Sequence, residues 1–380
     1  MNMKVLTVVG TRPEIIRLSE TIKLLDKHTN HVLVHTGQNY DYELNEVFFE
    51  NFGLRKPDYF LDADTSSLGA ALGSILAKME QVLLKEQPDA FLVLGDTNSS
   101  ISAVIAKRMK IPVFHMEAGN RSFDENVPEE INRRVVDHVS DYNLVYTEHA
   151  RRNLLAEGFH PARVLLTGSP MREVLDRNGE QISASDAVQR NGLITGGYFL
   201  VSLHREENVD CPTRLRSAIE ALQALRSEYG IPVLVSTHPR TRKRIDALDD
   251  RSAMDGIVFH PPFGFHDYIR LQLDARLVLS DSGTISEESS ILGFPAVTIR
   301  DFIERPEALD AGSIITTGLT PESILRSVSA RLSASAKADS RPAEYEVDNT
   351  AWRVLAAILS NAHSYRFRMG LHAGVPTSRL

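Results

Sequence analysis

The segment of residues 277–288 carries the residue types best suited to bind an anion. Its apolar half, residues 277–280, predicts a strand, and Asp281, Ser282 and Gly283 predict a turn that leads directly into a helix. The first turn of a helix leaves backbone N–H groups unpaired, with the positive end of the helix dipole behind them. The sequence therefore predicts a phosphate or diphosphate site, with Glu288 about one turn further on and within reach of a ribose hydroxyl. The alternative is a plain strand-to-helix connection capped by Asp281 or Ser282.

Four further segments place charged residues directly after apolar runs that predict strands. In doubly wound sheets, ligands bind beyond the carboxyl ends of the strands, so we expect these segments and the 281–283 turn to serve one ligand. The four segments are Gly10-Thr11-Arg12-Pro13-Glu14, Gly95-Asp96-Thr97-Asn98, His115-Met116-Glu117-Ala118-Gly119 and His204-Arg205-Glu206-Glu207-Asn208.

Three charged side chains in these segments each have an expected role and an alternative. Arg12 is placed to hold a phosphate beside a helix start, or else it is a surface arginine paired with Glu14. Asp96 lies at a strand tip, where it either acts on a ligand or caps the helix that begins near Ser99. Glu117 follows a buried strand, where a carboxylate must be solvated or used, and we expect that it is used.

Other charged groups leave two interpretations open. Glu129 and Arg133 lie on one face of a predicted helix, where they either join the site or form a stabilising surface pair. His204 either approaches a diphosphate or is a polar turn residue. In the basic run of residues 238–244, His238 and its neighbour face the site, whereas the rest is typical of a solvated helix face.

The composition limits the class of protein. The 380 residues are 42% hydrophobic and 24% charged, which is typical of a folded globular chain. The net charge of −8 argues against nucleic acid or an anionic membrane as the main partner, but it is compatible with a small anionic ligand. Cys211 is the single cysteine, so we expect neither a disulfide nor a thiolate metal cluster, and a cytoplasmic location.

The sequence also predicts catalysis without a metal or another cofactor. It contains no zinc-ligand spacing, no Walker lysine loop, no glycine-rich dinucleotide fingerprint and no serine nucleophile elbow. No apolar run approaches the roughly 20 residues that cross a bilayer.

Alternating strand and helix patterns predict an α/β fold with two Rossmann-like, doubly wound domains. The predicted domains are residues 1–167 and 168–348, with a surface linker at 333–346, a final helix at 349–362 that packs on the first domain, and a tail at 363–380. Helices are expected at 213–229 and 320–332. The predicted strands are residues 4–9, 31–36, 90–94, 113–116 and 142–146 in the first series, and residues 199–202, 232–236, 257–260, 277–280, 296–299 and 314–316 in the second.

Eight motifs in order resemble the non-hydrolysing UDP-N-acetylglucosamine 2-epimerase family. They are the four segments above, His35-Thr36-Gly37-Gln38, Pro128-Glu129-Glu130-Ile131-Asn132-Arg133, Asp281-Ser282-Gly283 and Glu304-Arg305-Pro306-Glu307. The resemblance implies the GT-B arrangement of two Rossmann-like domains facing a cleft, a UDP-sugar substrate and a homodimer.

The resemblance also implies roles for individual residues. Asp96, Glu117 and Glu129 would be the acid/base carboxylates, and His204 would assist departure of UDP. The residues that would bind UDP or the substrate are Arg12, Arg17, Arg133, His238, Ser282, Gly283, Thr284, Glu288 and Arg305.

Three departures from the family pattern bear on the sugar. Arg17 stands where the family often has lysine, Asn120 where leucine is usual, and Thr284-Ile285-Ser286 where Gly-Ile-Gln is typical. They resemble the subgroup that makes UDP-N-acetyl-L-fucosamine from UDP-2-acetamido-2,6-dideoxy-L-talose, and we expect that substrate. The alternatives are a UDP-GlcNAc/UDP-ManNAc 2-epimerase, a GT-B glycosyltransferase, a hydrolysing epimerase and a catalytically silent nucleotide-sugar sensor.

Overall fold

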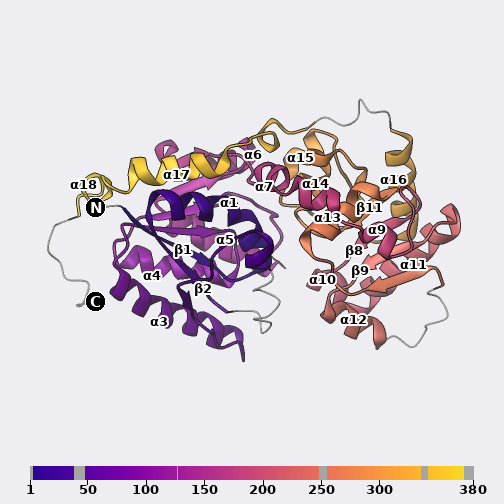
Figure 1. Ribbon diagram of the computed structural model, residues 1–380, viewed down its shortest axis with the longest axis horizontal. Helices are drawn as coiled ribbons and strands as arrows, with labels where there is room; N and C mark the ends of the chain where they lie inside the picture. Colours follow the sequence, from indigo (N-terminus) through magenta and orange to yellow (C-terminus); the bar gives the residue numbers. More distant parts are fainter. Residues whose placement is uncertain (1–2, 38–47, 126, 248–254, 335–340, 372–380) are drawn as a thin grey trace. The chain divides into compact units, whose positions relative to one another are not determined.

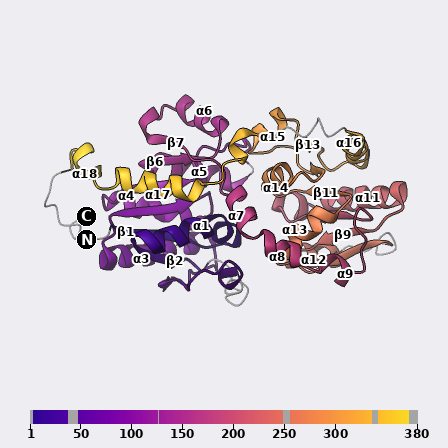
Figure 2. The ribbon, with the colours of Figure 1, turned by 45° about the horizontal axis from the view of Figure 1, so that its top comes forward.

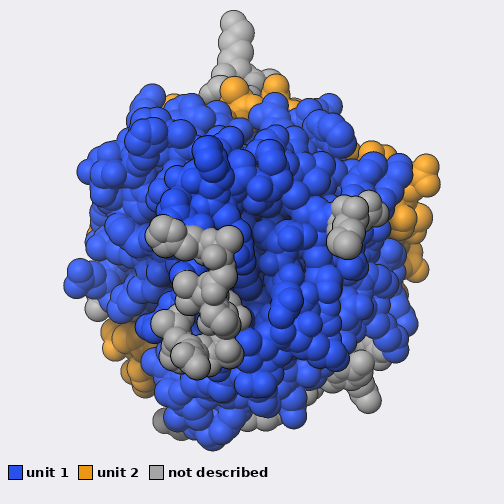
Figure 3. Space-filling model, turned by 90° about the vertical axis from the view of Figure 1, so that its left-hand side faces the viewer, with its two compact units in different colours: residues 1–174, 347–380 blue, residues 175–346 orange. Residues whose placement is uncertain are grey.

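The computed structural model describes residues 3–37, 48–125, 127–247, 255–334 and 341–371 (Figure 1). The chain divides into two compact units, each built on one parallel sheet. Unit 1 comprises Met1–Val174 and Val347–Leu380, and unit 2 comprises Leu175–Glu346 (Figure 3). The division falls within helix α7 (Met171–Arg177), beyond the 167/168 position favoured by the sequence. Within the described residues, no helix is long and apolar enough to cross a membrane.

Unit 1 contains a parallel sheet with the strand order β3-β2-β1-β4-β5-β6-β7. The chain moves outward from β1 to β3 and then returns to place β4 on the other side of β1, so the order reverses between β1 and β4. Strand β3 has two residues, too few to show the alternation by which a strand is recognised, and the sequence did not predict it. The strands are β1 (Lys4–Val9), β2 (Asn30–His35), β3 (Tyr59–Phe60), β4 (Ala90–Leu94), β5 (Val113–Met116), β6 (Tyr142–Val145) and β7 (Val164–Leu166).

Helices cover both faces of this sheet, as expected of parallel strands whose residues are almost all buried (Figures 1 and 2). Helix α17, the predicted final helix, packs against α1, where Trp352 makes an edge contact with His28. The helices of unit 1 are α1 (Arg12–His28), α3 (Leu68–Glu86), α4 (Ala103–Arg108), α5 (Pro128–Val139), α6 (Glu148–Ala156), α17 (Thr350–Asn361) and α18 (Tyr365–Arg368), with 3-10 helices η1 (Asn98–Ser102) and η2 (Pro161–Arg163).

Two predictions near the end of the chain need correction. The tail at 363–380 begins with the short helix α18, in which Tyr365 is buried; residues 372–380 lie outside the described part. The predicted surface linker at 333–346 includes the 3-10 helix η5 (Ala343–Tyr345), and Tyr345 is fully buried with its hydroxyl donating to Glu307 at 2.5 Å. Residues 335–340 of that linker lie outside the described part.

Unit 2 repeats the same plan with six parallel strands in the order β10-β9-β8-β11-β12-β13. Its order reverses between β8 and β11. The strands are β8 (Phe199–Ser202), β9 (Val233–Ser236), β10 (Ile257–His260), β11 (Leu277–Ser280), β12 (Ala296–Thr298) and β13 (Ile315–Thr316). The helices are α8 (Gly179–Ala184), α9 (Ala187–Arg190), α10 (Glu206–Val209), α11 (Pro212–Tyr229), α12 (Pro239–Asp246), α13 (Phe265–Asp274), α14 (Ile285–Leu292), α15 (Pro306–Asp310) and α16 (Pro321–Ser333).

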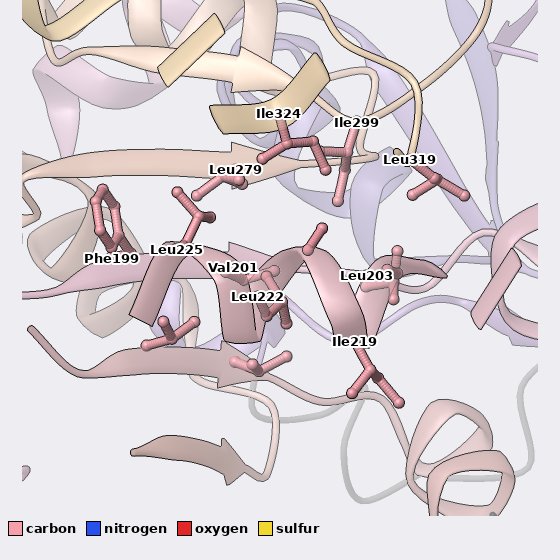
Figure 4. Packing of buried hydrophobic residues seen from close by; sticks show 14 of the residues in the cluster. Phe199, Val201, Leu203, Ile219, Leu222, Leu225, Leu279, Ile299, Leu319 and Ile324 are labelled. Carbon is pink, nitrogen blue, oxygen red and sulfur yellow. The ribbon is translucent and has the colours of Figure 1, made fainter. Parts of the chain in front are cut away.

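Helix α11 closes one face of the unit 2 sheet through a regular apolar stripe. Leu222 and Leu225 lie in one buried cluster with Phe199 and Val201 of β8, and Ile324 of α16 belongs to the same cluster (Figure 4). The spacing of Leu222 and Leu225 puts both side chains on one side of α11. Their removal from water stabilises the packing of α11 against β8.

We expect Leu222→Ala to lower the free energy of unfolding of unit 2 by about 2–5 kcal/mol, because it deletes buried methyl groups and leaves a cavity. Leu222 is 4% exposed, whereas Leu309 of the same unit is 43% exposed and provides the same substitution as a control. Denaturant titration followed by far-UV circular dichroism measures both variants. Equal losses in the two variants would contradict this description of the core.

Candidate active site

In unit 1 a buried carboxylate joins the loops that follow β1 and β4, the two strands at which the strand order reverses. Glu14 accepts hydrogen bonds from the backbone N–H groups of Gly10 and Thr11, both at 2.7 Å, and from the Thr97 hydroxyl at 2.6 Å. It is the third residue of α1 and forms a capping box with Thr11. Glu14 is therefore engaged with the backbone around Arg12, and the predicted alternative of a surface pair between the two is not the contact that the structure shows.

Burial raises the pKa of Glu14 to about 7, against the opposing effect of its hydrogen bonds from Thr97, Gly10 and Thr11. The donors are backbone amides and hydroxyls, which carry no formal charge and compensate only part of the lost hydration. Near neutral pH the protonated and ionised forms of Glu14 are therefore close in free energy.

Asp96, directly after β4, is held by an arginine from α5. Arg133 donates to Asp96 Oδ2 from Nε at 3.1 Å and from Nη2 at 2.6 Å, and its Nη1 donates to Glu130 Oε2 at 2.5 Å. Helix-capping is done by Thr97, whose side chain accepts from Ser99 N. Asp96 is thus not the cap of the following helix, and its carboxylate is oriented by a guanidinium fork instead.

Glu117, directly after β5, lies close to the loop that carries Asp96. Its Oε2 atom is 3.3 Å from Arg17 Nη1, its Oε1 atom accepts from Asn120 Nδ2 at 3.5 Å, and a β-carbon built on Gly95 would lie 3.9 Å from Oε2. Glu117 has φ +64°, a left-handed conformation that costs a non-glycine residue about 1–2 kcal/mol. Such strain persists only where the surroundings enforce it, and it often marks a functional position.

The remaining predicted residues of unit 1 are less enclosed. The Arg12 guanidinium lies over the Phe48 ring, 5.7 Å from its centroid, and is partly buried. Glu129 is exposed on the first turn of α5, next to the buried Glu130. Unit 1 therefore brings Asp96, Glu117, Arg17 and Arg133 to neighbouring strand ends, with Glu129 on the adjoining helix.

Unit 2 has a second buried carboxylate at its own point of strand-order reversal. Asp281, after β11, accepts from the backbone N–H groups of His204 at 3.0 Å and Arg205 at 2.9 Å and from Asn208 Nδ2 at 3.2 Å, all of which follow β8. His204 Nδ1 lies 2.9 Å from Asp281 Oδ1. Burial alone would raise the pKa of Asp281, but His204 and the other donors lower it to about 2. Asp281 is thus an anionic partner that fixes His204, rather than a helix cap.

The predicted anion-binding turn lies between two arginines. A β-carbon built on Gly283 would lie 3.8 Å from Arg205 Nη2 and 3.9 Å from Arg305 Nε. Arg305 Nη1 is 3.2 Å from Glu287 Oε2, and Arg205 Nη2 is 3.3 Å from Glu304 Oε1. The N-cap of helix α14 is Thr284, two residues after Ser282 and three after Asp281, the two predicted caps, and the Ser282 hydroxyl accepts from Thr284 N at 3.3 Å. The turn and its two guanidinium groups suit a diphosphate.

Glu288 and His238 complete the set of predicted residues in unit 2. Glu288 is buried in α14, and its Oε2 atom accepts from Gln272 Nε2 of α13 at 2.7 Å. His238 is the N-cap of α12, where its Nδ1 atom accepts from Arg240 N at 3.3 Å. Arg240 and Arg244 pair with Asp210, so acidic side chains of unit 2 neutralise part of the basic run.

Several residues of the site were not singled out from the sequence. They are Glu14, Asp281 in its bridging role, Gln272 and Glu304. Glu14 and Glu304 stand within the quoted motifs, but Gln272 lies in an ordinary amphipathic helix without a local signal. In the described ranges, no group of three or more His, Cys, Asp or Glu side chains is arranged to hold a metal ion.

Two parallel Rossmann-like sheets, with carboxylates at strand ends in one unit and a turn flanked by two arginines in the other, form a GT-B-like fold and are typical of enzymes of nucleotide-sugar chemistry. The fold is shared with Phytolacca americana UGT2, at a TM-score of 0.60 and 12% identity over 95% of this chain and 100% of that one.

The chain belongs to the UDP-N-acetylglucosamine 2-epimerase family, whose sequence profile matches residues 23–359, and it is an isomerase of that family. It is similar to a UDP-N-acetylglucosamine 2-epimerase from Rickettsia bellii, with a TM-score of 0.92 and 46% identity over 98% of this chain and 100% of that one. It is also similar to the Methanocaldococcus jannaschii UDP-GlcNAc 2-epimerase, solved with UDP-GlcNAc and UDP, with a TM-score of 0.87 and 35% identity over 94% of this chain and 100% of that one.

A third relative has a different named substrate. The UDP-2,3-diacetamido-2,3-dideoxy-D-glucuronate 2-epimerase of Pseudomonas aeruginosa is 37% identical over 359 residues, covering 90% of this chain and 99% of its own.

Glu14 is expected to make the stability of unit 1 depend on pH. Its pKa is raised from 4.5 to about 7 in the folded state, so the folded state binds the proton more tightly, and the stabilisation it gives below pH 4.5 is lost as pH rises through 7. A shift of this size corresponds to about 3 kcal/mol, and Glu14→Gln, which cannot ionise, should lack the change. The measurement is the difference in unfolding free energy between the two proteins at pH 5 and pH 8. A difference that is the same at both pH values would contradict the assignment.

Proposed function

We propose that this enzyme inverts C2 of a UDP-N-acetylhexosamine and that its substrate pair is UDP-GlcNAc and UDP-ManNAc. The observation that carries the proposal is the division of chemistry between the units. Unit 1 presents two carboxylates, Asp96 and Glu117, each beside an arginine. Unit 2 presents a diphosphate-sized turn beside Arg205 and Arg305. The family relationship and the substrates named for the Rickettsia and Methanocaldococcus relatives support the same reaction.

The chemistry of the sugar explains why both sets of residues are needed. The C2 proton of a UDP-N-acetylhexosamine has no neighbouring carbonyl to stabilise a carbanion, so a base alone would face a very high barrier. If the bond between C1 and the diphosphate oxygen breaks as the C2 proton leaves, the electron pair of the C2–H bond becomes the C1–C2 double bond. The products of this step are a 2-acetamidoglycal and UDP.

In the proposed reaction, unit 2 stabilises the negative charge that develops on the departing UDP. The backbone N–H groups at the start of α14 supply hydrogen-bond donors, Arg205 supplies a fixed positive charge, and His204 is held beside them by Asp281. Arg305 is oriented at the same turn by Glu287. We propose that Glu288, held by Gln272, binds the ribose hydroxyls.

The proposed acid/base groups are Asp96, Glu117 and Glu129. Inversion requires that a proton leave one face of C2 and a proton arrive at the opposite face, so two separate groups are needed. Arg133 holds Asp96, while Arg17 and Asn120 contact Glu117. These different partners allow the two carboxylates to differ in orientation, which suits a pair that acts on different faces.

Two observations bear on which sugar is used. Arg17 and Asn120, which depart from the family pattern, both contact Glu117 and favour UDP-2-acetamido-2,6-dideoxy-L-talose as an alternative substrate. The Pseudomonas relative, with its diacetamido sugar at 37% identity, shows that this level of identity spans more than one named sugar. We nevertheless prefer UDP-GlcNAc to the L-talose sugar that the sequence led us to expect, because both solved relatives are named for UDP-GlcNAc, one at 46% identity.

The first experiment follows solvent deuterium in the product. We expect the enzyme in deuterated water, with UDP-GlcNAc and no acceptor, to place deuterium at C2 of both epimers, because the abstracted proton exchanges before return. Proton NMR reads the loss of the C2 signal. Parallel incubations with UDP-2-acetamido-2,6-dideoxy-L-talose and UDP-2,3-diacetamido-2,3-dideoxy-D-glucuronate give the relative kcat/KM values. Sugar unchanged at C2 in all incubations would contradict the epimerase proposal, and free UDP accumulating with each turnover would indicate hydrolysis.

The second experiment tests the carboxylates. Asp96→Asn and Glu117→Gln should each lower kcat by a factor on the order of 10² to 10⁴, the range for losing a general acid or base, while UDP affinity stays nearly unchanged. UDP affinity is measured by isothermal titration calorimetry. If both variants turn over at the wild-type rate, the acid/base assignment is wrong.

A further inference from the structure

Behind the strand ends that carry Asp96 and Glu117 lies a fully buried charged cluster to which the reaction above assigns no role. His115 of β5, Asp137 of α5 and the Arg121 side chain are each 0% exposed. Arg121 Nη1 donates to Asp137 Oδ2 at 2.7 Å, and its Nε and Nη2 atoms form a two-pronged contact with Glu157. His115 Nδ1 lies 2.9 Å from Asp137 Oδ1. Buried charges are costly unless they are paired, so such a cluster calls for a reason beyond filling space.

Asp137 accepts hydrogen bonds from the backbone two residues after Glu117. The N–H of Gly119 donates to both carboxylate oxygens of Asp137, at 3.2 Å each. Gly119 has φ +80°, and a β-carbon there would lie 2.4 Å from the Ala150 carbonyl oxygen, so the loop has no room to shift toward α6. The Gly119 carbonyl accepts from Asn153 Nδ2 at 3.0 Å. The backbone on the C-terminal side of Glu117 is therefore held at both its N–H and its C=O groups.

Arg121 binds the backbone of the same loop one residue further from Asp137's contact, at Asn120. Its Nη1 atom donates to the Asn120 carbonyl at 2.7 Å as well as to Asp137. Asn120 is the residue whose side chain contacts Glu117. The strained left-handed backbone of Glu117 is thus followed at once by a segment tied to Asp137, which is the kind of surrounding that keeps a strained residue in place.

The other end of the cluster reaches the loop that carries Asp96. His115 Nε2 lies 2.8 Å from the carbonyl oxygen of Gly95, the residue directly before Asp96. A carbonyl oxygen can only accept, so Nε2 is the donor. Through His115 and Asp137, one pair of buried side chains therefore contacts the backbone beside both candidate acid/base residues.

We propose that His115 and Asp137 are positioning residues that set the Asp96 and Glu117 loops for proton transfer at C2. The catalytic consequence of this inference rests on the proposed function. The contacts that fix the two loops lie within unit 1 and do not depend on it. Loss of the His115 and Asp137 contacts should reduce the rate of proton transfer. It should leave binding of UDP unchanged, since the proposed diphosphate site belongs to unit 2.

The chain offers a matched control at the opposite end of β5. Asp141 is also 0% exposed, pairs with Lys107 and accepts from Val113 N at 3.1 Å, where β5 begins. Asp137→Asn and Asp141→Asn are therefore the same chemical change at equal burial, one beside the carboxyl end of the strand and one at its amino end. Both should lower the thermal midpoint. Only Asp137→Asn should lower kcat, by roughly 10- to 100-fold, with KM and UDP affinity within about threefold of wild type, because small displacements of reacting groups carry such penalties.

Hydrogen exchange provides a readout that needs no turnover. In the full-length protein, peptides covering residues 117–122 should exchange faster in Asp137→Asn than in wild type or Asp141→Asn. If Asp137→Asn does not fold, His115→Asn, whose shorter side chain cannot reach Gly95, serves in the kinetic measurement, and peptides that cover residues 95–98 then serve in the exchange measurement. Equal kcat for the Asp137 and Asp141 variants, or unchanged protection of residues 117–122, would overturn the proposal. If wild type shows no exchange at C2 with any UDP-sugar, the proposed function falls while the hydrogen-exchange result still decides the positioning role.

Discussion

The structure depends on one arrangement that occurs in both units: a buried carboxylate joins the two loops at the point where the strand order reverses. In unit 1, Glu14 joins the β1 loop to Thr97 of the β4 loop, and in unit 2, Asp281 joins the β11 loop to the β8 loop. At this point the connections that leave two neighbouring parallel strands run in opposite directions. They leave a crevice between them, and ligands bind in such crevices in open α/β sheets. A buried carboxylate that accepts hydrogen bonds from the neighbouring loop, from the Thr97 hydroxyl in unit 1 and from backbone N–H groups in unit 2, fixes the shape of that crevice before any ligand arrives.

The two carboxylates differ in how their burial is compensated. Asp281 has His204 beside it, and its pKa is about 2, so it remains an anion and holds the imidazole. Glu14 is surrounded by backbone amides and hydroxyls, and burial raises its pKa to about 7. The same geometric role is thus performed by an anion in the unit with the proposed diphosphate turn, and in the unit with the proposed acid/base carboxylates by a group whose protonated and ionised forms are close in free energy near pH 7. A full negative charge at Glu14 would lie on the loop that presents Arg12, a residue predicted from the sequence to bind phosphate.

The sequence predicted the fold and the loops of the site, but not the contacts between them. Apolar runs such as those that form β4 and β11 are local signals, and charged residues at their ends identify candidate side chains. The pairing of Asp96 with Arg133 joins residues on separate elements, and spacing alone equally allowed a pair between Glu129 and Arg133. Hydroxyl residues at 282 and 284 both suit an N-cap, so the start of α14 at Ile285 was not decided by residue type.

The buried polar residues Asp137 and Tyr345 could not be recognised from the local sequence pattern. Asp137 lies in a helix whose pattern predicts only an amphipathic face, and Tyr345 follows a segment whose composition is typical of a linker. Both become important because they are buried against residues far along the chain, Gly119 and Glu307 respectively. Polar residues buried by tertiary packing are therefore what sequence patterns miss most readily, and here they hold the loops on which the proposed chemistry depends.

The central claim is that the turn after β11 holds the diphosphate expelled from the sugar. A crystal structure of this protein with UDP tests it most directly. We expect the diphosphate within hydrogen-bond distance of the backbone N–H groups of residues 282–284, with Arg205 in contact and the ribose hydroxyls on Glu288. UDP bound with its diphosphate away from that turn would contradict the account.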